Sequence, residues 1–265
     1  MSKSALIKSS IAKKYWMALT GLFLCLFLVG HLAGNLQLMM DFGKDATIQF
    51  NDYAYFMTHN PAVKILSYLT YFSILFHAID GILLTVQNNK ARPKGYSKNK
   101  AGANSTFVSR NMAPLGLILL LFIIGHMAQF WGQMHFGDLP VYTKDGNEIK
   151  NLYFLVIAFF KDEKMGLIWA LIYLVCMIAI AMHLWHGFQS AFQSLGARTG
   201  KYKKLIVGVG KVFAIIIPLG FAIIPLYINL RMDISAEKLD MIHNYLGADD
   251  KKEQMKLLGQ ILMKK

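Results

Sequence analysis

The sequence predicts an all-α integral membrane protein, a bundle of five transmembrane helices. The 265-residue chain is 55% hydrophobic and only 16% charged, whereas a soluble domain carries about 25% charged residues. Its mean hydropathy is +0.40. The apolar residues are gathered into blocks long enough to cross a bilayer instead of alternating with polar ones, which places the chain in the membrane class.

The first apolar run follows a basic N-terminus. It is too long for the core of a cleavable signal peptide, so we expect a retained helix with Tyr15 and Trp16 as interfacial anchors. Polar connections separate this run from four more, and the connection between the second and third spans is rich in Asn, Ser and Gly, as loops are. The expected spans are residues 15–40, 62–86, 112–134, 166–195 and 212–230 of a five-helix domain, 1–230.

A polar tail, residues 231–265, follows the last span. Apolar residues recur in it at helical spacing, which predicts short amphipathic surface helices. Cys25 and Cys176 lie inside apolar runs and form no C-x-x-C pair, so we interpret them as small core residues and expect neither a disulfide framework nor a zinc site.

The basic residues are distributed asymmetrically. The N-terminus, the second connection and the fourth connection with Lys211 hold 15 Lys and Arg and no acid. Positive charge favours the cytoplasmic side, so we expect the N-terminus inside and the C-terminus outside. The net charge of +13 is therefore no nucleic-acid signal. The basic inner face is a candidate docking surface for a cytoplasmic partner, although topology and membrane lipid account for the same charge.

Four spans each carry a histidine in their apolar run. A histidine in hydrocarbon is costly and usually has a partner or a function. Counting 1.5 Å per residue along each helix places His31 and His126 beyond the midplane toward the outside, and His77 and His183 nearer the inside. The sequence therefore offers an outer pair and an inner pair.

The local contexts agree with this pairing. His31 and His126 each follow a glycine, and His77 and His183 share the pattern H-x-x-x-G. Two histidines at one depth on facing helices suit a bis-imidazole haem, and a six-coordinate iron suits electron transfer. The chain has no C-x-x-C-H for covalent haem, so we expect two haem b groups. His186 stays an alternative to His183 as the fourth ligand.

We expect three other histidines and one aspartate to be in contact with solvent and to have no role in the site. The sequence places three further histidines in connections or in the tail, where we interpret them as surface residues: His59, His135 and His243. Asp80 is the one acid inside a span, one turn from the inner end, where it can be solvated.

The four histidine motifs resemble those of a known family. GHLAGN, FHAIDG, GHMAQF and MHLWHGFQS, followed by a histidine-free fifth span, are similar to the cytochrome b subunit of succinate dehydrogenase or fumarate reductase, in its single-chain, five-helix, two-haem type. The resemblance covers residues 13–230 and implies one axial haem ligand on each of the first four spans. These ligands are His31 and His126 for the outer haem, and His77 and His183 for the inner haem.

The resemblance also implies partners and a location. By this resemblance we expect an FAD flavoprotein and an iron–sulfur protein to bind on the cytoplasmic side of the bacterial cytoplasmic membrane. The flavoprotein would oxidise succinate or reduce fumarate, and this subunit would exchange electrons with quinone. The polar candidates for a quinone site near the outer haem are Asn35, Gln37, Gln129 and Gln133.

Two alternatives stay open from the sequence. One is a dihaem cytochrome b of another quinone-linked complex, of the hydrogenase or formate dehydrogenase type. The other is a haem-free membrane transporter or anchor whose histidines relay protons or pack. The pairing by depth and the lack of inverted repeats with broken helices count against the second alternative.

Overall fold

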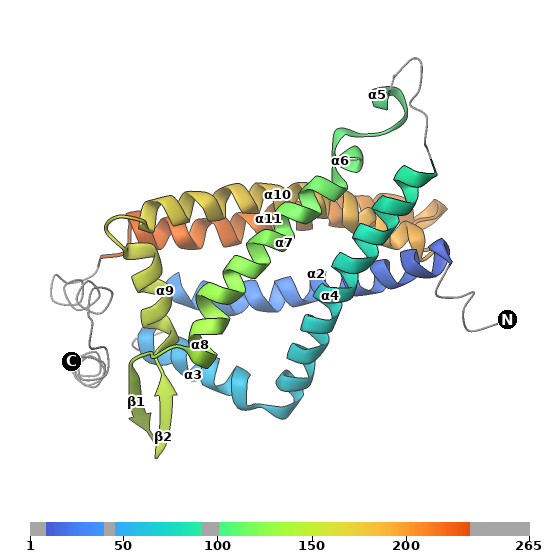
Figure 1. Ribbon diagram of the computed structural model, residues 1–265. Coiled ribbons are helices and arrows are strands. Elements are labelled where there is room, and N and C mark those ends of the chain that lie inside the picture. The colour runs from blue at the N-terminus through green and yellow to red at the C-terminus, as the bar shows by residue number, and fades with distance from the viewer. Residues whose placement is uncertain (1–8, 40–45, 92–100, 234–265) are drawn as a thin grey trace. The chain divides into compact units, whose positions relative to one another are not determined.

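The computed structural model describes residues 9–39, 46–91 and 101–233, and their regular secondary structure is helical apart from one β-hairpin (Figure 1). The predicted all-α fold class is therefore confirmed. The amphipathic helices predicted for the tail lie outside the described residues. The elements are α2 Ser10–Leu36, η1 Gln37–Met39, α3 Ala46–His59, α4 Pro61–Lys90, α5 Ala101–Asn104, α6 Phe107–Arg110, α7 Met112–His126, η2 Met127–Gly132, α8 Gln133–Phe136, β1 Val141–Lys144, β2 Asn147–Lys150, α9 Leu152–Lys161, α10 Gly166–Ser194, η3 Gly200–Tyr202 and α11 Lys203–Leu230.

Five helical stretches in the described part of the chain are long and apolar enough to cross a membrane, as in a multi-pass membrane protein. The first four agree with the predicted spans to within five residues at each end. The fifth differs, because α11 begins at Lys203, before the predicted start at Val212. Lysines at a helix end can lay their aliphatic stems along apolar surface while the ammonium groups stay in water, so the basic segment continues the helix. The five stretches are Ser10–Met39, Pro61–Lys90, Met112–Phe136, Gly166–Ser194 and Gly200–Leu230.

Side chains at the helix ends explain where two of these helices begin. Asn60 accepts hydrogen bonds from the backbone N–H groups of Ala62 (2.9 Å) and Val63 (3.3 Å), and Pro61 occupies the first helical position, which has no need of an N–H donor. Asp162 similarly accepts from Lys164 and Met165 before α10. These caps satisfy amide groups that have no partner inside the helix.

The chain forms two compact units, and the first comprises Met1–His31, Ile65–Leu121 and Cys176–Leu219. Its core joins α2, α10 and α11 through Cys25, Leu184 and Ala214. A Cβ atom at Gly210 of α11 would lie 2.8 Å from the Phe188 ring of α10. The glycine therefore lets Phe188 pack directly against the α11 backbone.

The second unit comprises Leu32–Lys64, Phe122–Val175 and Gly220–Lys265. Asn51 of α3 and Asn151 before α9 are 0% and 2% exposed. The Asn51 amide donates to Asn151 Oδ1 (2.9 Å) and accepts from the Tyr153 backbone N–H (2.9 Å), while Asn151 Oδ1 also accepts from the Phe154 N–H (2.9 Å). This buried pair of amides fastens α3 to the start of α9.

The two connections in this unit are more ordered than the sequence suggested, because α3, α9 and the β1–β2 hairpin lie in segments that we expected to be polar connections. The hairpin turns at Asp145 and Gly146, both with positive φ (50° and 77°), as a tight two-residue turn demands. The Lys144 ammonium pairs with Asp52 of α3 at 2.5 Å. This ion pair and the buried amides attach the connections to one another.

Candidate functional site

The inner pair of histidines meets in the first unit. His77 of α4 and His183 of α10 have ring centroids 6.2 Å apart, with an angle of 66° between the ring planes. An imidazole nitrogen binds a metal ion at about 2.0–2.1 Å, and its ring centroid lies about 1.1 Å behind it, so two imidazoles on opposite sides of one ion have centroids about 6.3 Å apart. The observed separation therefore fits coordination of one ion between the rings.

The His77 ring is oriented by helix α2. Its Nδ1 lies 3.2 Å from the carbonyl oxygen of Met17 and 3.3 Å from the Thr20 hydroxyl. The Thr20 hydroxyl donates to the Trp16 carbonyl oxygen (2.8 Å), so toward His77 it acts as an acceptor. Both neighbours need a donor, so Nδ1 carries the proton and Nε2 keeps the free lone pair that a metal ion requires.

One ring nitrogen of His183 lacks a hydrogen-bond partner among the described residues. This nitrogen, Nδ1, is buried. Buried polar atoms are nearly always satisfied. His183 Nδ1 therefore needs a hydrogen-bond or metal partner other than the described residues.

Glycines from three helices flank the inner pair. A Cβ atom at Gly21 of α2 would lie 3.1 Å from His77 Cε1, one at Gly116 of α7 would lie 4.0 Å from His183 Cε1, and one at Gly187 of α10 would lie 3.9 Å from His183 Cδ2. At Gly81, the partner of Gly187 in the shared H-x-x-x-G pattern, an added Cβ would meet nothing within 4 Å. Glycine at Gly21, Gly116 and Gly187 thus leaves no Cβ atom beside the two imidazole rings.

The geometry favours His183 over His186 as the partner of His77, because His183 supplies the ring that faces His77. Beside His186, the Trp185 ring lies 5.5 Å from the Lys211 ammonium group. His186 is half-buried. Its assignment as the alternative ligand therefore gains no support.

The two histidines of the predicted outer pair belong to different units, so their pairing stays a prediction. His31 stacks on Phe27 in the first unit, with ring centroids 5.2 Å apart. In the second unit His126 Nδ1 lies 3.3 Å from the Tyr173 hydroxyl of α10, which donates to Gln129 Oε1 at 2.7 Å. Directly after His126 the helix widens into the π-helical segment η2, a feature that is frequent at functional sites.

The four quinone candidates have different surroundings. Gln129 is engaged by Tyr173, whereas Asn35 is half-buried and Gln133 is exposed. Gln37 accepts a long hydrogen bond from Gln49 Nε2 (3.4 Å), and Gln49 Oε1 is buried without a partner in the described part of the chain. Sequence reasoning missed Gln49, because it lies on α3 in a segment interpreted as a polar connection.

Tyr53, also on α3, packs against the end of helix α2. A Cβ atom at Gly34 would lie 2.8 Å from the Tyr53 ring, so the glycine permits the contact. Partial burial raises the pKa of the Tyr53 hydroxyl above its ordinary value.

Two of the three histidines expected at the surface are found there. His59 and His135 are exposed, and each ring stacks on an aromatic residue four positions earlier, Tyr55 and Trp131 respectively. His243 lies outside the described residues. Asp80 is half-buried.

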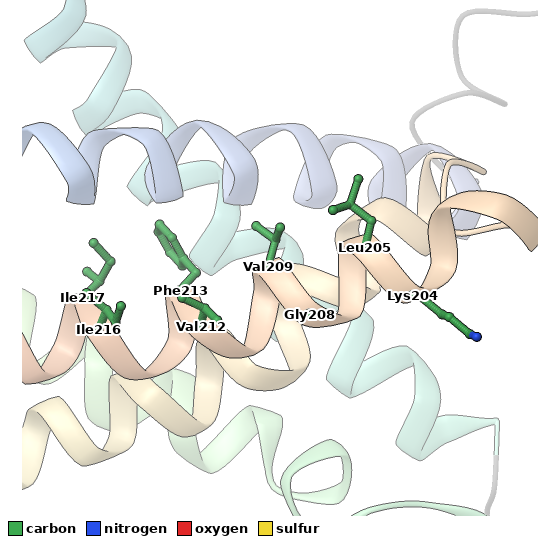
Figure 2. A pocket seen from close by; sticks show the side chains of 8 residues that line it. All are labelled: Lys204, Leu205, Gly208, Val209, Val212, Phe213, Ile216 and Ile217. Atoms are coloured by element: carbon green, nitrogen blue, oxygen red, sulfur yellow. The ribbon is translucent and has the colours of Figure 1, made fainter.

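A separate apolar pocket of about 570 Å³ lies along α11. Figure 2 shows the side chains of Leu205, Val209 and Phe213 on one side of the helix and Lys204 directed away from them. None of the predicted site residues lines it. Its lining residues are Lys204, Leu205, Gly208, Val209, Val212, Phe213, Ile216 and Ile217.

Searches for related sequences and structures give no support of their own. Comparison with known protein families, with curated proteins and with solved structures finds no match.

Proposed function

We propose that the chain is the membrane-anchoring dihaem cytochrome b subunit of a succinate:quinone oxidoreductase, a succinate dehydrogenase or fumarate reductase. It would pass electrons between an iron–sulfur protein and quinone. The observation that carries the proposal is the His77–His183 pair, with its ring separation of 6.2 Å inside helices long and apolar enough to span a membrane. The succinate or fumarate chemistry would take place on a partner flavoprotein.

The donor set suits haem better than a bare metal ion. In the described ranges no group of three or more His, Cys, Asp or Glu side chains is arranged to hold a metal ion. A haem iron needs only two axial ligands from the protein, because the macrocycle provides the others. Two imidazoles at a separation that fits one iron, with glycines beside them, are what such a group would meet.

Residues of the chain itself orient the His77 ring. Met17 and Thr20 contact Nδ1 of the His77 ring and so leave the lone pair of Nε2 free for a ligand. The apolar helices keep water away, which strengthens every electrostatic interaction at the site. Haem b, when bound, would supply one-electron transfer.

The remaining parts of the proposal follow from the resemblance and from the charge distribution. The N-terminus would face the cytoplasm of a bacterial cell, where the FAD flavoprotein and the iron–sulfur protein bind, and the C-terminus would face outside. The outer half, with His31 and His126, would serve quinone. Both directions of turnover are compatible with this arrangement.

The first test is cofactor content. The purified chain should contain two b-type haems, non-covalently bound and low-spin, because four histidines in two pairs provide two sets of axial ligands. Pyridine haemochrome quantification against protein concentration, with a reduced-minus-oxidised spectrum, measures this directly. A colourless protein would support the transporter alternative, and a single haem would contradict the outer pair. Co-purifying partners separate the succinate-linked complex from the hydrogenase and formate dehydrogenase types.

A second test concerns the partner face. Lys201, Lys203 and Lys204 are exposed at the start of the fifth span, and rim charges of this kind orient association with a partner. Replacing all three by Gln should make the soluble subunits dissociate at lower salt concentration than in wild type, with both haems retained.

The matched control replaces two exposed lysines expected on the outer side, Lys64 near the start of the second span and Lys164 in the third connection, and it should leave dissociation unchanged. If the positive charge serves topology alone, the triple variant will resist the salt wash like wild type. A reporter fusion confirms that its orientation is unaltered.

A further inference from the structure

We propose that Tyr173 and Gln129 are positioning residues for His126, which they hold in the tautomer that presents Nε2 to the outer haem. The inference rests on the proposed function, since it assigns a role toward that cofactor. It concerns Gln129, which stands three residues after the ligand in the GHMAQF motif, and Tyr173, which lies in none of the four motifs. Gln129 was a quinone candidate from the sequence, and Tyr173 had no assigned role.

The hydrogen-bond directions follow from counting donors. A tyrosine hydroxyl has one hydrogen, and that of Tyr173 is donated to Gln129 Oε1 over 2.7 Å. Toward His126 Nδ1, 3.3 Å away, the Tyr173 oxygen can then only accept. Nδ1 of the neutral imidazole therefore carries the proton, and the lone pair lies on Nε2.

The packing around Tyr173 makes this contact rigid. Tyr173 is 8% exposed, and its ring is held edge-on by Phe122 (centroids 5.0 Å apart) and Phe160 (5.1 Å apart). A buried phenol must place its hydroxyl on a partner. The aromatic cluster thus aims the hydroxyl, and the hydroxyl in turn fixes the His126 ring.

The same arrangement orients the inner ligand with different atoms. His77 has its Nδ1 held by the Met17 carbonyl oxygen and by Thr20. In both cases a group outside the ring leaves Nε2 as the available ligand atom. Partners that orient a histidine ligand in this way also raise its basicity, and their removal typically weakens metal binding by about 10–100-fold.

The side chain of Tyr173 permits a clean substitution. Tyr173→Phe removes the hydroxyl and keeps the ring that packs against Phe122 and Phe160. Gln129→Leu removes the acceptor at the other end of the chain of hydrogen bonds, whereas Gln129→Glu keeps an acceptor there. Thr20→Val is the converse control, because it alters the surroundings of the inner ligand only.

The experiment uses the full-length, haem-loaded chain. Haem transfer to apomyoglobin measures retention of each haem, and a potentiometric titration gives the midpoint potential of each spectral component, with the outer one identified by its loss in His126→Ala. In Tyr173→Phe we expect the outer haem to be held about 10–100-fold more weakly. Its midpoint potential should rise, because a less basic imidazole stabilises ferric iron less. The inner component should stay unchanged, and Thr20→Val should show the reverse pattern.

The outcomes separate this inference from the function on which it rests. A wild-type chain without haem would overturn the proposed function. A wild-type chain with two haems, whose outer component is unchanged in both Tyr173→Phe and Gln129→Leu, would overturn the positioning role alone. If Tyr173→Phe does not accumulate in the membrane, Gln129→Leu, with Gln129→Glu as the conservative rescue, carries the same test.

Discussion

His77→Ala and His183→Ala are each expected to abolish the same haem completely and to leave the other haem in place. Each substitution removes one of two imidazoles whose ring centroids lie 6.2 Å apart, and an iron with a single remaining protein ligand loses its low-spin spectrum and its retention. The measurement is the haem-to-protein ratio, together with the low-temperature reduced spectrum in which two b-type components are resolved.

Two further variants make this experiment specific. His186→Ala should retain both haems, and the double variant His77→Ala/His183→Ala should look like either single variant, because both ligands serve one group. Should His186→Ala remove the inner haem while His183→Ala does not, the choice between these two residues is wrong. Should His31→Ala and His77→Ala lose one and the same component, the pairing by depth is wrong.

Asn51→Ala should produce the largest loss of stability among the polar residues of the second unit. Asn51 is 0% exposed and links Asn151 Oδ1 to the Tyr153 N–H. Its truncation leaves buried groups unsatisfied, at a cost of about 1–3 kcal/mol for each group that finds no new partner. Hydrogen exchange and limited proteolysis of α3 and α9 in detergent should show both helices opening together.

The control for this prediction is Asn147→Ala in the hairpin. Asn147 is exposed, and its side-chain amide makes only a long hydrogen bond to the Asp145 carbonyl oxygen among the described residues (3.4 Å), so a change of about 0.5 kcal/mol or less is expected. Equal protection of α3 in the two variants would show that the buried amides do not fasten this helix.

The transmembrane helices could be predicted because their signal is long and uninterrupted. The elements between them could not be predicted in the same way. Their apolar stretches are short, so the hydropathy of any longer window is lowered by the charged residues beside them. Helix α9, LYFLVIAFFK, is only 10 residues long, too short for a span, and its burial becomes evident only through Asn51 and Asn151. The hairpin is the exception, because Asp145–Gly146 is a strong turn signal in the sequence itself.

The candidate site was predictable to a different degree. His77 and His183 could be chosen because a titratable ring in an apolar run is conspicuous in any sequence. Tyr173 is one of 12 tyrosines, and nothing in its spacing marks it, since its role depends on a contact with His126 made through another helix. Gln49 could not be predicted for the same reason, because its contact is with Gln37 in another element.

The main-chain atom that orients His77 determines which substitutions helix α2 can tolerate. The Met17 carbonyl oxygen belongs to the main chain, so exchanging the side chain at position 17 leaves the orienting group in place as long as the helix persists. The constraint falls instead on Gly21, one turn later, where even a methyl group would come 3.1 Å from the His77 ring. In an alanine scan along α2, Gly21→Ala would therefore disturb the His77 site, although glycine has no side chain. Met17→Ala would leave the site intact, although residue 17 supplies the hydrogen bond.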